Sequence, residues 1–103
     1  MSGVFSFKYT TENELFTFDY SPILAASETI SSAACNVIVM DGTDANPNAI
    51  KQGSPSIQGA KVVQRVSGGT SSVTYRLEMT VTTSLTNVYT LVGDLPVYSP
   101  EVV

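Results

Sequence analysis

The sequence of 103 residues lacks histidine and tryptophan, and it contains a single cysteine, Cys35. Without histidine the commonest general base is missing, and the usual zinc sites and nucleophile–histidine pairs cannot be built. The oxygen-rich segment 41–48 does not continue as an EF-hand loop, because Ala49 and Pro55 stand where that loop requires glycine and glutamate. Most carboxylates fall in predicted turns or on wet strand faces. We therefore predict no enzyme activity, no cofactor and no metal site.

Charge is also scarce, since Asp, Glu, Lys and Arg together make up only 14% of the chain. The five basic residues are scattered, whereas direct nucleic-acid binding needs a concentrated positive field. The first residues show no basic segment followed by a long apolar run, and no stretch approaches the length of a membrane span, so we expect neither secretion by the general pathway nor a membrane anchor. A lone cysteine excludes an internal disulfide, so we expect synthesis in a reducing cytoplasm. The polar positions carry mainly Ser, Thr, Asn and Gln, which lose less on desolvation than Lys or Glu and favour a packed, multi-subunit setting.

Apolar and polar residues alternate with a period of two, most clearly over residues 73–81. This pattern predicts a half-buried strand. The preceding residues 61–66 predict a second strand, and the Gly-Gly turn between them predicts that the two form a β-hairpin. Residues 87–95 predict a third strand, which would complete an antiparallel meander.

Other β-rich segments lie upstream. Residues 29–40 predict a long strand, and alternation over 5–9 and 16–20 predicts two more. Short edge strands are expected around 49–51 and 56–58, within a stretch rich in Gly, Pro, Asn and Ser. The length fits a single domain, residues 1–103, with a possible N-terminal arm (1–12) and a possible C-terminal arm (96–103). The predicted fold is all-β, an immunoglobulin-like antiparallel β-sandwich of about seven strands, with a small barrel as the alternative.

Three residues have predicted structural roles in such a sandwich. Tyr75 lies near the start of its strand, where a tyrosine either bonds through its hydroxyl to upstream backbone as a tyrosine corner or packs in the core. Cys35 either occupies the position of the first cysteine of the usual inter-sheet pair, with Leu77 at the position of the second, or is a small buried apolar residue.

The two ends of the chain are more apolar than free tails would be. They either form edge strands of this domain or act as arms that dock on a neighbouring subunit. The candidate interface residues are Val4, Phe5, Phe7, Tyr9, Val97, Tyr98, Val102 and Val103.

Four short segments resemble small bacteriophage structural proteins that serve as fibre-tail adaptors or neck components. They are residues 19–24 (DYSPIL), 27–32 (SETISS), 67–70 (SGGT) and 73–77 (VTYRL). Two features depart from that family's pattern: Glu28 stands where Asp is usual, and the tryptophan often found in the first long strand is absent. The resemblance implies an immunoglobulin-like sandwich in a virion, without cofactor or catalysis.

On this basis we expect a non-enzymatic virion protein, a head-tail, neck or fibre-tail adaptor made in the host cytoplasm and assembled as a ring of copies. Its expected partners are other copies of the chain and portal, tail or fibre proteins, or the capsid protein, with no direct nucleic acid and no membrane. A capsid decoration protein is the alternative within the virion. A receptor- or carbohydrate-binding module is the alternative from another class, and Tyr89 and Tyr98 are its only obvious aromatic candidates.

Overall fold

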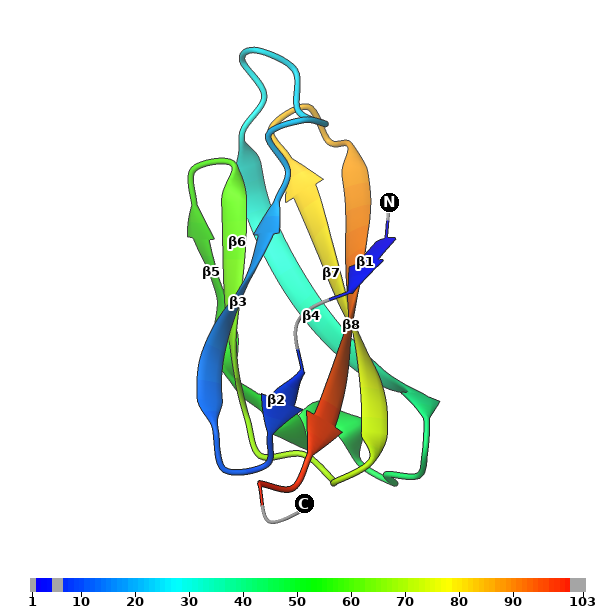
Figure 1. Ribbon diagram of the computed structural model, residues 1–103. Helices are drawn as coiled ribbons and strands as arrows, with labels where there is room; N and C mark the ends of the chain where they lie inside the picture. The colour runs from blue at the N-terminus through cyan, green and yellow to red at the C-terminus, as the bar shows by residue number, and fades with distance from the viewer. Residues whose placement is uncertain (1, 5–6, 101–103) are drawn as a thin grey trace.

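The computed structural model describes residues 2–4 and 7–100 as a two-layer β-structure (Figure 1). Among these residues the only regular helix is a short 3₁₀ turn, so none is long and apolar enough to cross a membrane. The elements are β1 (Ser2–Val4), β2 (Lys8–Tyr9), β3 (Asn13–Asp19), β4 (Ile30–Asp41), η1 (Pro47–Ile50), β5 (Lys51–Gln58), β6 (Lys61–Ser67), β7 (Val73–Thr83) and β8 (Val88–Tyr98).

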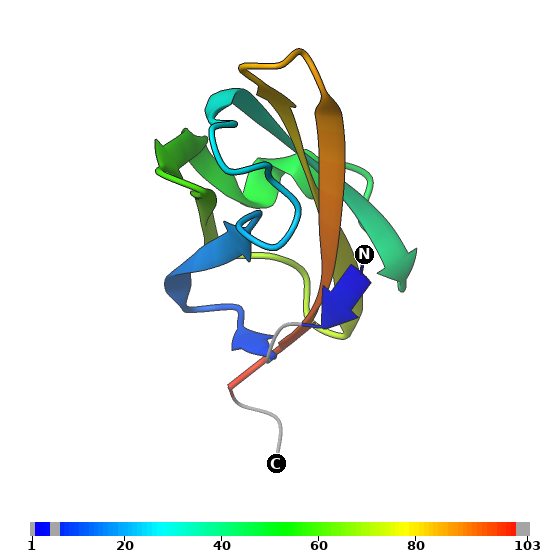
Figure 2. The ribbon, with the colours of Figure 1, turned by 90° about the horizontal axis from the view of Figure 1, so that it is seen from above.

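Two sheets face each other, as the view from above shows (Figure 2). We call the sheet of β4, β7 and β8 sheet A; its strands are antiparallel, and both β1 and β2 pair with β8 in parallel. Sheet B has the order β3-β6-β5 and is antiparallel throughout. Lettering β3 to β8 as strands B to G gives the immunoglobulin arrangement of B, E and D against C, F and G. The predicted sandwich is confirmed.

The core lies between the sheets and follows from the alternation of side chains along each strand. On β7 every second residue from Val73 to Val81 is buried, which confirms the predicted strand over 73–81. Phe16 and Phe18 of β3 pack from the other sheet. The buried Tyr20 donates a hydrogen bond from its hydroxyl to the Met79 carbonyl, and so joins the end of β3 to the middle of β7.

The predicted hairpin between 61–66 and 73–81 is wrong, because β6 and β7 lie in different sheets. Both edges of β7 are occupied, by β4 on one side and by β8 on the other. The Gly68-Gly69 turn, with φ of +74° and +102°, instead carries the chain across from sheet B to sheet A. Of the predicted meander, the pairing of β7 with β8 is observed and the pairing of β6 with β7 is not.

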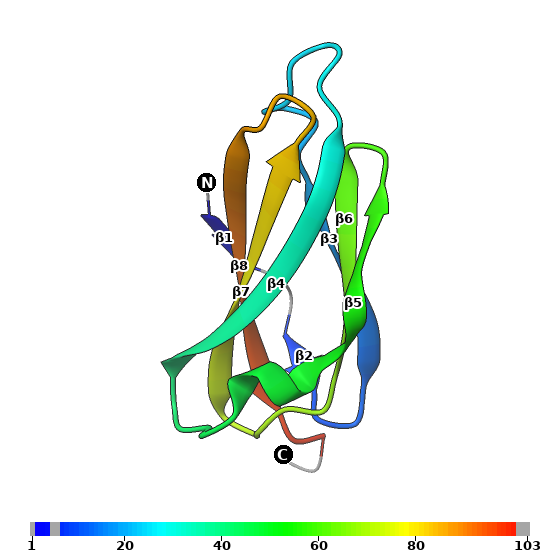
Figure 3. The same ribbon diagram turned by 180° about the vertical axis from the view of Figure 1, so that it is seen from behind.

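The predicted strand at 29–40 is observed as β4, which forms the outer edge of sheet A (Figure 3). Side chains from the following segment cover part of this edge. The Val37 N–H donates to the Asn48 side-chain oxygen at 2.9 Å, and the Lys51 ammonium donates to the Cys35 carbonyl at 2.6 Å. The edge strand expected at 56–58 is observed as the end of β5, which is irregular between Gln52 and Ser56. The separate strand expected at 49–51 is wrong, because residues 47–50 form η1 and Lys51 begins β5. Covering edge groups with side chains discourages unwanted strand pairing.

Candidate interface at one end of the sandwich

β2 lies alongside the end of β8 at one end of the molecule (Figure 1). Three exposed aromatic residues gather there. Phe7 is 51% exposed, Tyr98 46% and Tyr9 37%. The centroid of the Phe7 ring lies 5.2 Å from the centroid of the Tyr9 ring and 5.7 Å from that of the Tyr98 ring, and both pairs have edge-to-face geometry. We call these three residues the aromatic cluster. Preorganised exposed aromatics of this kind are enriched in protein interfaces.

Parallel pairing of β2 with β8 builds the cluster. Tyr9 lies directly opposite Tyr98, and the Thr10 N–H donates to the Tyr98 carbonyl at 2.9 Å. The Glu12 carboxylate accepts a hydrogen bond of 2.8 Å from the Tyr9 N–H, which closes the turn after β2. Because side chains alternate along an extended chain, Phe7 and Tyr9 point outward together while the residue between them points inward.

That intervening residue is Lys8, which is fully buried. Its ammonium group donates to the Tyr9 carbonyl at 2.7 Å and also to the Gly68 carbonyl in the β6–β7 connection. Burial lowers the pKa of Lys8, and the negative charges of Glu12 and Glu14 act in the opposite direction. Buried lysines are rare. Lys8 therefore ties β2, and with it two members of the aromatic cluster, to the loop between the sheets. A role for Lys8 was not predicted from the sequence, although its position between two aromatic residues of an alternating segment was a usable signal.

The same connection is fixed from its other side by Tyr75. Its hydroxyl accepts a hydrogen bond of 2.7 Å from the Thr70 N–H, five residues upstream, and donates one of 2.6 Å to Asp44. This is the geometry of a tyrosine corner, one of the two roles expected for this residue. The hydrogen bond from Tyr75 lowers the pKa of Asp44, while burial raises the pKa of Tyr75. The corner thus joins the loop at Asp44 to the loop at Thr70, beside the aromatic cluster.

The suggested inter-sheet pairing of Cys35 with Leu77 is wrong, because the two residues lie on neighbouring strands of the same sheet. Cys35 is instead a small buried residue, and burial raises the pKa of its thiol to about 11. A thiol with this pKa is a poor nucleophile at neutral pH.

The structure brings together only part of the predicted interface set. Phe7, Tyr9 and Tyr98 share one surface, whereas Val97 is 1% exposed, because β8 continues through residue 98 and alternation turns Val97 into the core. Its assignment to the interface was wrong. Val4 ends β1, where it pairs with Asp94. Phe5, Val102 and Val103 lie outside the described residues.

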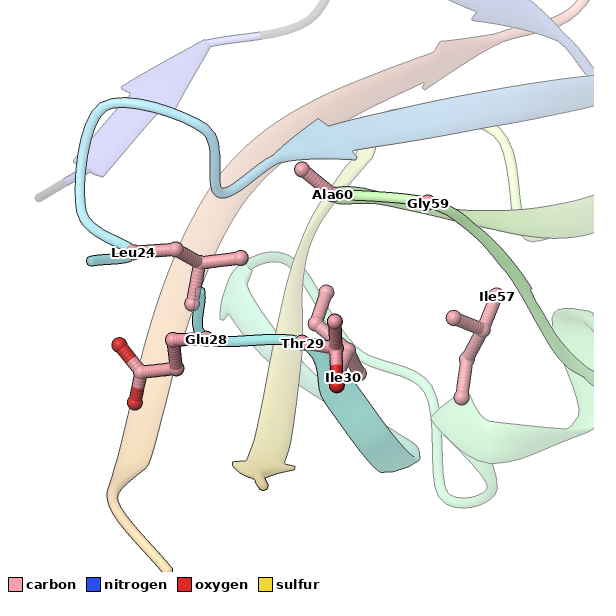
Figure 4. A pocket seen from close by; sticks show the side chains of 7 residues that line it. All are labelled: Leu24, Glu28, Thr29, Ile30, Ile57, Gly59 and Ala60. Atoms are coloured by element: carbon pink, nitrogen blue, oxygen red, sulfur yellow. The ribbon is translucent and has the colours of Figure 1, made fainter. Parts of the chain in front are cut away.

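A pocket of about 360 Å³ lies at the opposite end, between the start of β4 and the β5–β6 turn (Figure 4). Its walls are mostly apolar, and the Glu28 carboxylate points away from Ile30 and Ile57. That carboxylate accepts hydrogen bonds from the Ala25 N–H at 3.0 Å, from the Asn87 amide at 2.9 Å and from the Thr83 hydroxyl. These bonds lower the pKa of Glu28, the Thr83 contact most. Glu28 thus serves to hold loops together.

Neither a metal site nor an aromatic sugar platform emerges from the described side chains. No group of three or more Cys, Asp or Glu residues is placed to hold a metal ion in residues 2–4 and 7–100. Tyr89 is partly buried against the core, and Tyr98 lies nine positions further along β8, about 30 Å away at the usual strand rise. The two tyrosines therefore do not share a surface.

Comparison with known proteins gives one family match. A family model described as podophage GP4 fiber-tail adaptor protein gp77 matches residues 8–92. No curated protein sequence matches the chain. The matched residues run from Lys8 to Val92 in the first half of β8, and so include sheet B, β4, β7 and the tyrosine corner.

Proposed function

The chain belongs to the podophage GP4 fiber-tail adaptor family, gp77, and from this premise we propose that it links a tail fibre to the tail through its aromatic cluster. The family is one of bacteriophage structural adaptors, which supports the proposal that the chain acts by binding and not as an enzyme. The chain would then reside in the virion after synthesis in the host cytoplasm. An adaptor needs rigid, preorganised contact surfaces, and the observation that carries the proposal is the exposed, mutually packed set of Phe7, Tyr9 and Tyr98.

The aromatic cluster has the size of an interface centre and not of a whole interface. A fully buried aromatic side chain removes roughly 150–250 Å² from water, so three half-exposed rings offer about 300 Å². A standard interface uses about 800 Å² per partner. Aromatic residues at the centre of such a patch commonly carry most of the binding energy. We therefore assign the cluster the role of an anchor, with polar residues around it completing the contact.

Rigidity of the anchor comes from the loop beneath it. Lys8 holds β2 against Gly68, and Tyr75 holds the same loop through Thr70. Side chains that are already fixed lose little conformational entropy on binding.

Several copies acting together would strengthen the attachment. We propose a ring of copies, in which a modest contact per copy gives firm attachment because the sites act together. Ring symmetry requires that one surface of each copy contacts a different surface of the next.

The test is complementation of a phage that lacks the gene. The double variant Phe7→Ser/Tyr98→Ser removes two exposed rings, and loss of an anchor worth about 2 kcal/mol or more weakens binding by roughly 30-fold. We expect particles that lack tail fibres, measured by mass spectrometry of purified virions and by electron microscopy. The matched control is Val88→Ser, which removes a 62% exposed apolar side chain at the other end of β8. Full fibre occupancy with the double variant would contradict the proposal.

A further inference from the structure

The outer surface of sheet A carries little uncompensated charge. Side chains of β4, β7 and β8 that do not enter the core point to this surface by alternation. Among the described residues of these strands that face outward, the charged ones are Asp41, Arg76, Glu78 and Asp94, a net charge of −2. Surfaces that become the centre of protein interfaces are typically depleted in charge.

Three pairs of polar side chains on this surface are hydrogen-bonded to each other. Arg76 binds Asp94 through two contacts, of 2.7 and 3.1 Å. The hydroxyls of Thr80 and Thr90 lie 2.8 Å apart. Glu78 accepts a hydrogen bond of 3.1 Å from the Asn36 amide. A neighbour that covers this surface therefore leaves few polar groups without partners, and the desolvation penalty is small.

The outer surface of sheet B has a net charge of the opposite sign, which is positive. Its outward-facing charged residues in the described strands are Asp19, Lys61 and Arg65, a net charge of +1. Arg65 donates to the neutral side chain of Asn13 at 3.0 Å, which leaves its charge uncompensated by that contact. Leu15, next to Arg65 in the register and 51% exposed, adds an apolar projection.

The area of sheet A is adequate for association. Three strands of eleven or twelve residues, at about 3.3 Å per residue and about 4.8 Å between strands, give a projected area of roughly 500 Å². The accessible area exceeds the projection, so it approaches the roughly 800 Å² per partner of a standard interface. This surface is larger than the aromatic cluster and lies along the long side of a molecule measuring 49 × 21 × 19 Å.

We infer that the outer surface of sheet A in one copy packs against the outer surface of sheet B in the next copy. The contact is heterologous, so it repeats from copy to copy and closes into a ring when the rotation allows. It places opposite net charges together and leaves both ends of the long axis, with the aromatic cluster and the pocket, free for other proteins. The inference rests on the proposed ring and adds the surfaces that form it.

Site-directed cross-linking tests this arrangement on the purified full chain. Thr80→Cys labels the outer surface of sheet A and Thr17→Cys that of sheet B, while the native Cys35 is buried and unreactive. At about 100 μM, where even micromolar interfaces are populated, a flexible bis-maleimide should give mixed dimers as the main product of the two variants together. Each variant alone should give no cross-linked dimer. The matched control, Leu85→Cys at a 55% exposed end position, should not cross-link to Thr17→Cys.

Two results would overturn the inference. Cross-linking of Thr80→Cys with itself would mean that sheet A packs face to face in a two-fold dimer. Absence of mixed dimers at this concentration would mean that the surfaces do not meet. As a further check, Glu78→Lys changes the net charge of the outer surface of sheet A from −2 to 0 and should lower the mixed-dimer yield severalfold at low salt. Phe7→Ser/Tyr98→Ser should leave the yield unchanged, so failure of the lateral contact is distinguishable from failure of the fibre attachment.

Discussion

Removing the Tyr75 hydroxyl tests whether the corner that supports the aromatic end stabilises the fold. Tyr75→Phe keeps the ring, which is fully buried, and deletes the acceptor of the Thr70 N–H. Loss of this hydrogen bond costs about 1–2 kcal/mol, because the amide is left in a partly buried place without its partner. The Tyr75 hydroxyl also donates to Asp44, but water can solvate that carboxylate in the variant. We therefore expect this second hydrogen bond to add little to the loss of stability. For a domain of this size the melting temperature should fall by roughly 5–10 °C.

The assay is urea unfolding followed by far-UV circular dichroism, which does not require tryptophan. With a slope of about 1.5 kcal/mol per molar urea, the midpoint should fall by about 1 M at unchanged slope. Tyr89→Phe is the matched control, because Tyr89 is only partly buried, and we expect a change below about 0.5 kcal/mol. If both variants lost the same free energy, or neither lost any, the stabilising role of the corner would be refuted.

Two further predictions concern the core and the charged surface. Leu77→Ala should lower the free energy of unfolding by about 2–5 kcal/mol because Leu77 is fully buried, whereas Leu15→Ala, at a 51% exposed position, should change it by less than about 0.5 kcal/mol in the same urea assay. The pKa values of Asp44 and Asp94 lie below the usual 3.8, so their stabilising contributions are fully present above that pH and are lost as the pH falls through the lower folded values. The melting temperature of the wild-type protein should therefore fall steeply between pH 5 and pH 2, and the fall should be smaller in Asp94→Asn. An equal fall in both proteins would show that Asp94 does not contribute to the pH dependence of stability.

Local sequence patterns predicted the strands better than they predicted strand partners. Alternation over 73–81 specifies which side chains are buried, and β7 agrees residue by residue. It says nothing about which strand lies alongside. The Gly-Gly turn adopts the positive φ values that a tight hairpin also needs, so the local signal was the same for both outcomes. Tertiary contacts determine that the chain crosses from sheet B to sheet A at this turn. β4 and β8 occupy both edges of β7, and the Tyr75 hydroxyl accepts a hydrogen bond from the Thr70 N–H.

The last strand was predicted too short because Pro96 was taken as the start of a possible arm. The Ser72 N–H donates to the Val97 carbonyl and the Thr10 N–H donates to the Tyr98 carbonyl, so backbone groups along β8 point alternately to β7 and to the opposite edge. Pro96 therefore faces the edge, between the end of β1 and the start of β2, where its missing N–H interrupts no ladder bond. The aromatic cluster could not be derived in full, because its assembly depends on a pairing between residues 9 and 98 that no local pattern encodes.

The parallel pairing of β1 and β2 with β8 also determines how the protein responds to mechanical load. Opposing forces on the two ends of the chain run along these strands, so the hydrogen bonds between them are sheared together and not peeled apart one after another. Shearing must break several bonds at once, which makes this geometry resistant to pulling. In an adaptor that carried load through its chain ends, this geometry would resist extension.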